Sequence, residues 1–170
     1  MTVFAQVGVE CNVAVASYDV GLASAVIDAW DDLPDRARIA ALRRVPPEQF
    51  SLARNTTCVE LHEWAVDGLC GKDTPALSEM AVGTNGTTPA ETDRSLGNEV
   101  ARIPLSSIEG NGDEVLTAAY LDEGEANGNT LQEIGLYADD RFLNHASISP
   151  VDKDASTTVT IEVSISFTAL

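Results

Sequence analysis

The sequence predicts an α+β fold, in which an N-terminal strand and short helices precede a mainly antiparallel, β-sandwich-like C-terminal domain. Three observations predict it: alternating apolar residues at positions 3–17, helix signals up to residue 71, and repeated strand-and-turn patterns from residue 76 onward. We expect residues 1–54 to form an attachment or assembly segment with one strand and two helices. Residues 55–75 form a connecting helix, and residues 76–170 form the antiparallel β domain.

The N-terminal strand is predicted from a strict period of two. Apolar residues or cysteine occupy the odd positions from Val3 to Val15, while Gln6, Glu10 and Asn12 are among the even ones. This pattern is typical of a strand with one buried face. Its length and polar reverse face suit pairing with another subunit as well as with its own chain.

Two short helices are expected next. Asp19 can cap the first, whose apolar residues recur at helical spacing: Leu22, Val26, Ala29 and Leu33. Pro34 ends that helix and can start the second, which is built around Ile39 and Leu42 and ended by Pro46-Pro47. Four arginines crowd the second helix: Arg36, Arg38, Arg43 and Arg44. They could dock an acidic neighbouring subunit, but a solvated helical face is the preferred interpretation.

The third helix has a start signal in Thr57 and Glu60, which have capping-box spacing. Its expected buried face is Leu61, Ala65 and Leu69, and Gly71 stands where a left-handed residue commonly ends a helix. The helix contains His62-Glu63, but position 66 is valine where a zinc protease motif needs a second histidine. The other histidine is His145, so no histidine-based metal site is expected.

The C-terminal half is predicted to consist of strands and tight turns. Residues 78–82 form a short apolar run, and residues 83–89 form a glycine-rich loop without the Gly-Lys-Ser/Thr ending of a phosphate-binding loop. Runs 100–108 and 115–121 flank Gly110-Asn111-Gly112, and runs 130–138 and 142–148 flank Asp139-Asp140, so each pair predicts a β-hairpin. Residues 158–169 alternate without error and predict the last strand.

The charge is extreme, with a formal net charge of −17 and a pI near 4.2. Residues 1–54 carry a net charge of −2 and residues 55–170 a net charge of −15. Phosphate binding needs the opposite sign, so nucleic acid is not an expected partner. A basic partner or a very salty environment could explain the acidity, and we prefer a halophilic source because molar salt screens self-repulsion.

Cysteine content and hydropathy set further limits. Three cysteines, Cys11, Cys58 and Cys70, are an odd and sparse set, so we expect buried free thiols and no disulfide framework. No apolar run reaches the ~18 residues that a membrane span requires, and the N-terminus has no evident export signal. We therefore expect no membrane insertion.

Several segments in a fixed order resemble a known family. They are Met80–Pro89, Thr92–Arg102, Asn127-Gly128, Leu131–Tyr137, Asn144–Lys153 and the alternating C-terminal strand. In this order they resemble β-rich tail-fibre and baseplate-associated proteins of tailed viruses. Residues 55–64, Asn-Thr-Thr-Cys-Val-Glu-Leu-His-Glu-Trp, are similar to the version found in tailed viruses of halophilic archaea. The resemblance covers about residues 55–170, and residues 1–54 match nothing in it.

The resemblance implies a non-enzymatic structural protein of a virion, located in the tail tip, baseplate or fibre and made in the host cytoplasm. Its expected partners are other virion proteins and copies of itself, as a trimer or hexamer, and it could support attachment to the host surface. A head-vertex or turret component and a cell-surface carbohydrate-binding β module are the alternatives. The aromatic candidates for the latter are Trp30, Trp64, Tyr120 and Tyr137.

No catalytic, cofactor-binding or metal-ligating residue is predicted. Carboxylate pairs such as Glu123 and Glu125 carry little information in so acidic a chain. Residues 122–125 could hold a hard cation, but they lack the full spacing of a calcium loop, so diffuse association of potassium or sodium is preferred. Glu133 could pair with Arg102 or Arg141, or face solvent; Lys153 could neutralise Asp152 or Asp154, or be solvated.

Overall fold

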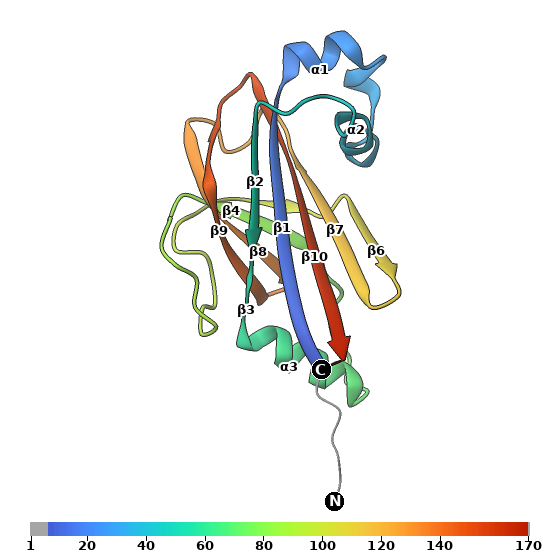
Figure 1. Ribbon diagram of the computed structural model, residues 1–170, viewed down its shortest axis with the longest axis vertical. Coiled ribbons are helices and arrows are strands. Elements are labelled where there is room, and N and C mark those ends of the chain that lie inside the picture. The colour runs from blue at the N-terminus through green and yellow to red at the C-terminus, as the bar shows by residue number, and fades with distance from the viewer. Residues whose placement is uncertain (1–6, 170) are drawn as a thin grey trace, which may run out of the picture.

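The computed structural model describes residues 7–169, with side chains for residues 8–168. Two five-stranded antiparallel sheets pack face to face as a sandwich, with two α-helices at one end and a third at the other (Figure 1). The predicted α+β, sandwich-like class is confirmed.

The two sheets are called sheet A and sheet B. Sheet A has the order β2 (Gln49–Arg54), β1 (Val7–Asp19), β10 (Thr157–Ala169), β7 (Glu114–Leu121) and β6 (Ser107–Asn111). Sheet B has the order β3 (Thr56–Thr57), β9 (Arg141–Lys153), β8 (Asn129–Ala138), β4 (Glu79–Gly83) and β5 (Glu99–Pro104).

The first and last strands form the centre of sheet A. β1 pairs with β10 along its whole length, from Val7 opposite Ala169 to Asp19 opposite Thr157. Its other edge pairs with β2 over residues 12–17. The long N-terminal strand therefore pairs within its own chain, and positions 3–6 of the predicted strand lie outside the described residues.

The main core lies between the two sheets. The alternating apolar residues of β1 and β10 point inward as predicted, since Val13, Val15, Ile161 and Val163 are all fully buried. They pack against apolar residues of sheet B: Met80, Val82, Ile134, Leu136, Leu143 and Ala146. Cys11, Leu61 and Val159 belong to the same cluster. Residues 1–54, 55–75 and 76–170, which the sequence divided into three segments, therefore share one core.

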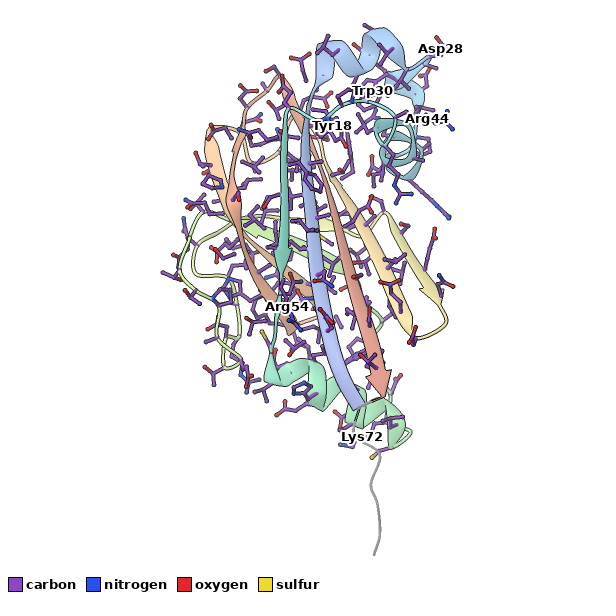
Figure 2. All side chains as sticks on the ribbon, in the orientation of Figure 1. Tyr18, Asp28, Trp30, Arg44, Arg54 and Lys72 are labelled. Atoms are coloured by element: carbon purple, nitrogen blue, oxygen red, sulfur yellow. The ribbon has the colours of Figure 1, made fainter. Side chains whose placement is uncertain are left out.

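A second apolar cluster covers the outer face of sheet A at one end. It is formed by α1 (Val20–Val26), the 3-10 helix η1 (Trp30–Asp32) and α2 (Asp35–Leu42). Trp30 packs edge-on against Tyr120, and Figure 2 labels Trp30 and Tyr18 at this end of the molecule. Ile39 and Leu42 are buried here, as predicted.

The first helix follows the sequence prediction only at its start. Asp19 caps it as expected, because the Leu22 N–H donates to Asp19 Oδ1 at 2.7 Å. The predicted extension to Leu33 is wrong, since α1 ends at Val26 and Ala29 turns the chain with φ 57°. The physical reason is burial of Trp30 against the sheet, which leaves Leu22 and Val26 exposed and Ala23 buried.

The third helix, α3 (Val59–Leu69), lies at the opposite end of the sandwich (Figure 1). The predicted capping box is wrong: Thr57 belongs to β3, and Glu60 accepts from the Phe142 N–H and from Arg94 instead. Leu61 is buried as predicted, but Leu69 is 89% exposed. Gly71 has φ +73°, which confirms the left-handed residue after the helix.

Both predicted hairpins are confirmed. β6 and β7 pair across Gly112, and β8 and β9 pair across Asp139; both turn residues have positive φ. The single strand predicted over residues 100–108 is wrong, because the chain crosses there from sheet B to sheet A. β5 ends at Pro104 in one sheet, and β6 begins at Ser107 in the other.

Candidate functional site

A buried carboxylate holds loop 84–98, which follows β4 and includes most of the glycine-rich residues 83–89, against the outer face of sheet B. Glu133 on β8 is completely buried. Its carboxylate accepts backbone N–H groups of Asn85 at 3.1 Å, Gly97 at 2.9 Å and Asn98 at 2.8 Å. An ionised buried carboxylate needs such donors, because burial without partners costs several kcal/mol. Glu133 therefore ties both ends of the loop to the sheet.

His145 on β9 extends this arrangement. Its Nε2 lies 3.1 Å from Glu133 Oε2 and its Nδ1 lies 2.7 Å from Asp93 Oδ2, with Asp93 belonging to loop 84–98. We call Asp93, His145 and Glu133 the carboxylate–histidine cluster. A neutral imidazole has one N–H, so hydrogen bonding to both carboxyls needs one further proton, on the ring or on a carboxyl.

Asp93 is held in place from two sides. Its Oδ2 also accepts the Ala90 N–H at 2.8 Å. Burial alone would raise the pKa of Asp93, but the hydrogen bonds from Ala90 and His145 and the nearby imidazole hold that pKa below its ordinary value of 3.8. The ionised form of Asp93 therefore fixes the middle of the loop.

Glycines allow the loop to approach this closely. A Cβ at Gly83 would meet Glu133 Oε1 and, at 2.6 Å, the carbonyl oxygen of Asn98. A Cβ at Gly97 would overlap the Asn85 side chain, and one at Gly135 would overlap the Phe142 ring. Neither Gly83 nor Gly86 has a positive φ, and a Cβ at Gly86 would lie 2.7 Å from Gln132 Oε1. They are needed for close approach instead.

The predicted partners of Glu133 are wrong. Arg102 pairs with Glu99 at 2.7 Å and stacks on the Tyr137 ring at 3.7 Å, while Arg141 pairs with Asp67 at 3.0 Å. The arginines stay at the surface, whereas Glu133 faces the loop. Sequence spacing gave no sign of this, since residues 85, 97 and 98 are far from residue 133 in the chain.

Two of the thiols, Cys11 and Cys58, are buried. Burial is the main cause that raises the pKa of Cys58 to about 12, and burial likewise raises the pKa of Cys11 to about 12. A protonated thiol is a poor nucleophile. The prediction of buried free thiols holds for these two, but Cys70 is exposed.

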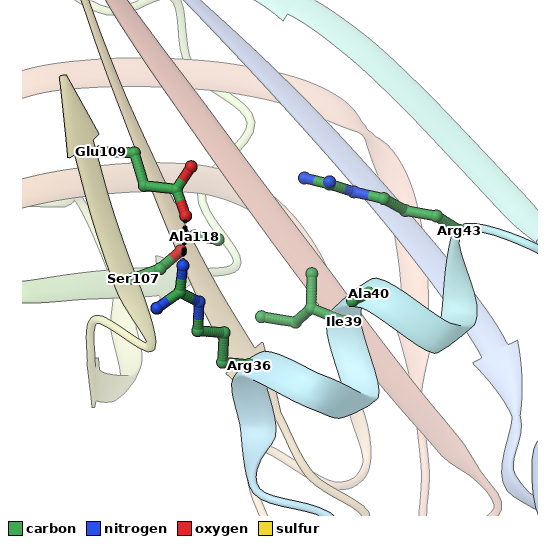
Figure 3. Close-up of a pocket in the computed structure, with 7 residues that line it drawn as sticks. All are labelled: Arg36, Ile39, Ala40, Arg43, Ser107, Glu109 and Ala118. Atoms are coloured by element: carbon green, nitrogen blue, oxygen red, sulfur yellow. Dashed lines mark hydrogen bonds and ion pairs between the residues drawn. The ribbon is translucent and has the colours of Figure 1, made fainter. Parts of the chain in front are cut away.

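A shallow pocket of about 190 Å³ lies between α2 and strands β6 and β7 (Figure 3). Arg36 and Glu109 close it with an ion pair of 2.7 Å. It is smaller than the ~300 Å³ lower limit of typical ligand pockets.

Two of the other arginines near α2 also have partners. Arg43 pairs with Glu162 of β10, and Arg38 lies over the rings of Trp30 and Tyr120. Three of the four predicted surface arginines thus contact their own chain.

The aromatic residues considered for sugar binding lie mainly inside. Trp30, Tyr120 and Tyr137 are buried, and half-buried Trp64 donates its Nε1–H to the Pro75 carbonyl at 2.8 Å. Sugar sites commonly use exposed aromatic faces, so this placement does not favour a carbohydrate-binding module.

Eight large apolar side chains of the described residues are exposed, and six of them, all but Ile108 and Leu116, lie in pairs at three places. Phe50 and Leu52 are on β2, Leu22 and Val26 on α1, and Val66 and Leu69 on α3. Phe50 and Leu52 lie opposite Ala16 and Ala14 of β1 and share the outer face of sheet A with them. An apolar hollow of about 360 Å³ lies beside Leu69, between α3 and Phe167 of β10. Grouped exposed apolar residues are typical of interaction surfaces.

The acidic loop 122–125 uses its carboxylates internally. Asp122 Oδ1 accepts the Gly124 N–H at 2.7 Å, and Glu125 Oε2 accepts the Asp122 N–H at 3.1 Å. Over the described residues, no cluster of three or more potential ligands could hold a metal ion. No helix within residues 7–169 has the length and apolar character for crossing a membrane.

Comparison with known proteins yields no relative. No family model matches the chain. Searches of curated proteins and of solved structures also find no significant match.

Proposed function

We propose that this protein is a non-enzymatic structural component of the virion of a tailed virus of halophilic archaea, part of the tail tip, baseplate or fibre. It assembles with other virion proteins and with copies of itself, as a trimer or hexamer. Support of host attachment is a further part of this role.

The main support for the proposal is that the segments resembling tail-fibre and baseplate-associated proteins lie together in the folded chain. Residues 80–89 and 92–102 supply β4, loop 84–98 and part of β5, while residues 131–137 and 144–153 supply most of β8 and β9. These segments meet at the carboxylate–histidine cluster, which joins Asp93, Glu133 and His145. The segments that carry the resemblance thus form one packed unit, as expected if they specify a shared structural module.

The surface supports an assembly role. The exposed apolar pairs of β2, α1 and α3 are side chains that a partner subunit can bury. The net charge of −17 suits a protein that assembles in concentrated salt, because a Debye length of about 3 Å at 1 M leaves short-range apolar contacts dominant.

The test is the mass of the purified protein in about 1 M sodium chloride, measured by light scattering after size exclusion. We expect a trimer or hexamer; a strict monomer that binds no other virion protein contradicts the proposal. Serine replacement of the Phe50–Leu52, Leu22–Val26 or Val66–Leu69 pair, each in a separate variant, identifies the contact. The pair that lies in the subunit interface lowers the mass to that of a monomer, and the other two serve as matched controls.

Location on the virion is a separate measurement. Antibody labelling of purified virions under the electron microscope is expected to mark the tail. Labelling at the head vertices supports the turret alternative instead. The carbohydrate-binding alternative is disfavoured by the burial of Trp30, Tyr120 and Tyr137. Binding of host-surface sugars in molar salt would nevertheless support it.

A further inference from the structure

Lys153, at the end of β9, is a buried amine with unusual partners. Only 2% of the residue is exposed. Its Nζ donates to Asn127 Oδ1 at 2.7 Å and to its neighbour's backbone carbonyl, Asp154 O, at 2.9 Å. Both acceptors are uncharged, whereas buried lysines are usually paired with a carboxylate. From the sequence, Lys153 was expected to neutralise Asp152 or Asp154, or to be solvated. Solvation is wrong, because the amine is buried. The amine contacts the backbone carbonyl of Asp154, not its carboxylate, and the two charges act on each other without a direct ion pair.

Asn127 is held in one orientation against this amine. Its Nδ2 donates to the Glu123 carbonyl at 2.7 Å, while its Oδ1 accepts from Lys153. The Gly128 N–H donates to the Lys153 carbonyl at 2.8 Å, and Asn129 lies opposite Lys153 in the β8–β9 ladder. The backbone thus fixes the side-chain amide within hydrogen-bonding distance of the amine before any reaction.

Burial and nearby charges act in opposite directions on the ionisation of Lys153. Burial lowers the pKa of Lys153, although the charges of Asp122, Asp154, Glu123 and Glu125 oppose this effect. Burial raises the pKa of Glu125, with the charges of Asp122 and Asp35 adding to it. The charges of Lys153 and Glu125 act on one another, but the amine's direct partners are Asn127 Oδ1 and the Asp154 carbonyl. Neutral amine is the nucleophilic form of lysine.

We propose that Lys153 and Asn127 form an intramolecular isopeptide bond. Lys153 passes a proton to Glu125, and its neutral Nζ attacks Cγ of Asn127. The Cγ–Nδ2 bond breaks as a second amine proton and the proton on Glu125 move to the departing nitrogen. An ammonium side chain and an amide thus become a secondary amide and an ammonium ion, with no oxidation or reduction. The bond ties the end of β9 to the turn before β8.

Succinimide formation at Asn127-Gly128 is the competing reaction, because it also releases ammonia. It requires attack by the Gly128 nitrogen on Cγ of Asn127. That nitrogen is engaged in the hydrogen bond to the Lys153 carbonyl. The lysine amine is the better-placed and more nucleophilic group, so the cross-link is the expected product.

The test is the intact mass of the purified, denatured protein. We expect a mass below that of the sequence by one ammonia molecule, and a branched proteolytic peptide that joins residues 127 and 153. Lys153→Arg and Asn127→Ala each restore the full mass, while Glu125→Gln lowers the cross-linked fraction. Lys72→Arg is the matched control; Lys72 pairs with Asp67 at 2.6 Å on the surface, so its replacement keeps the ammonia loss.

Two results overturn the proposal. One is a full, unmodified mass of the wild-type protein after prolonged incubation in salt. The other is ammonia loss that persists in Lys153→Arg without a branched peptide, which identifies a succinimide. The wild-type mass and peptide map decide the question even if a variant fails to fold, and neither measurement depends on the assembly role.

Discussion

Glu133 is an acidic residue in the middle of an apolar strand, and its contacts explain why it is there. Three backbone N–H groups of loop 84–98 donate to it, and His145 joins it to Asp93. Without Glu133, these buried donors would lose their partners, at about 1–3 kcal/mol each. At the scale of single residues, polar contacts to a remote loop decide which side chain is needed on this strand.

The close approach of Gly83 to Glu133 gives a prediction with an internal control. Gly83→Ala places a Cβ against the Glu133 carboxylate and the Asn98 carbonyl, so we expect a loss of about 1–3 kcal/mol in the free energy of unfolding. Gly110→Ala has open space around its Cβ and no positive φ, so its effect stays within about 0.5 kcal/mol. Urea unfolding in molar salt measures both. Equal stabilities of the two variants would contradict the packing argument.

The lowered pKa of Asp93 predicts that the folded protein loses stability in acid. Its pKa in the folded state lies below its ordinary value of 3.8, so its contribution to stability is present above pH 3.8 and is lost as the pH falls through the folded pKa. Asp93→Asn is expected to cost about 1–2 kcal/mol at neutral pH, because a charge-assisted hydrogen bond to His145 is weakened.

The difference between the wild type and Asp93→Asn is expected to shrink as the pH falls below 3.8. Unfolding curves at a series of pH values test this. A difference that stays constant from neutral pH down into that acid range would show that the Asp93 charge is not involved.

The apolar face of helix α2, and not its arginines, attaches the helix to sheet A. Ile39 and Leu42 are buried against Ala118 and Tyr120 of β7. The Arg36–Glu109 pair is exposed on both sides, with 70% and 56% of the two side chains accessible. Ion pairs of this kind contribute about 0–1 kcal/mol.

Substitutions in α2 separate these two contributions. Leu42→Ala removes a fully buried side chain, and we expect a loss of about 2–5 kcal/mol in the free energy of unfolding. Arg36→Ala is expected to cost less than about 1 kcal/mol, and less still in molar salt. A larger loss for Arg36→Ala than for Leu42→Ala would mean that the ion pair holds the helix.

The large negative charge of the whole molecule affects its stability. With a net charge of −17 over 170 residues, self-repulsion opposes the compact state at low ionic strength. Raising the salt from about 0.1 M to about 1 M shortens the Debye length from about 10 Å to about 3 Å. Stability of this chain is therefore coupled to salt through its total charge, in addition to its core.

The melting temperature is expected to rise steeply over this range of sodium chloride concentration, and equally in potassium chloride. Near pH 4.2, where the net charge approaches zero, the same salt series is expected to have a much smaller effect. Calorimetry at the two pH values measures this. Equal salt dependence at both would contradict an origin in net charge.

The sequence by itself determined the elements whose signals are local. Strict alternation predicted β1 and β10, turn residues predicted the β6–β7 and β8–β9 hairpins, and Asp19 predicted the start of α1. These features depend on side-chain period and backbone preference within a few residues, so one segment contains all the information needed.

Only the tertiary structure decided the features that join distant segments. The pairing of β1 with β10, the crossing between sheets at residues 105–106, and the early end of α1 at Val26, ahead of buried Trp30, each satisfy packing across the molecule. The carboxylate–histidine cluster and the Lys153–Asn127 contact are likewise invisible in sequence spacing. Their physical reason is the same: a buried polar group takes the partners that the fold brings to it, wherever they lie in the chain.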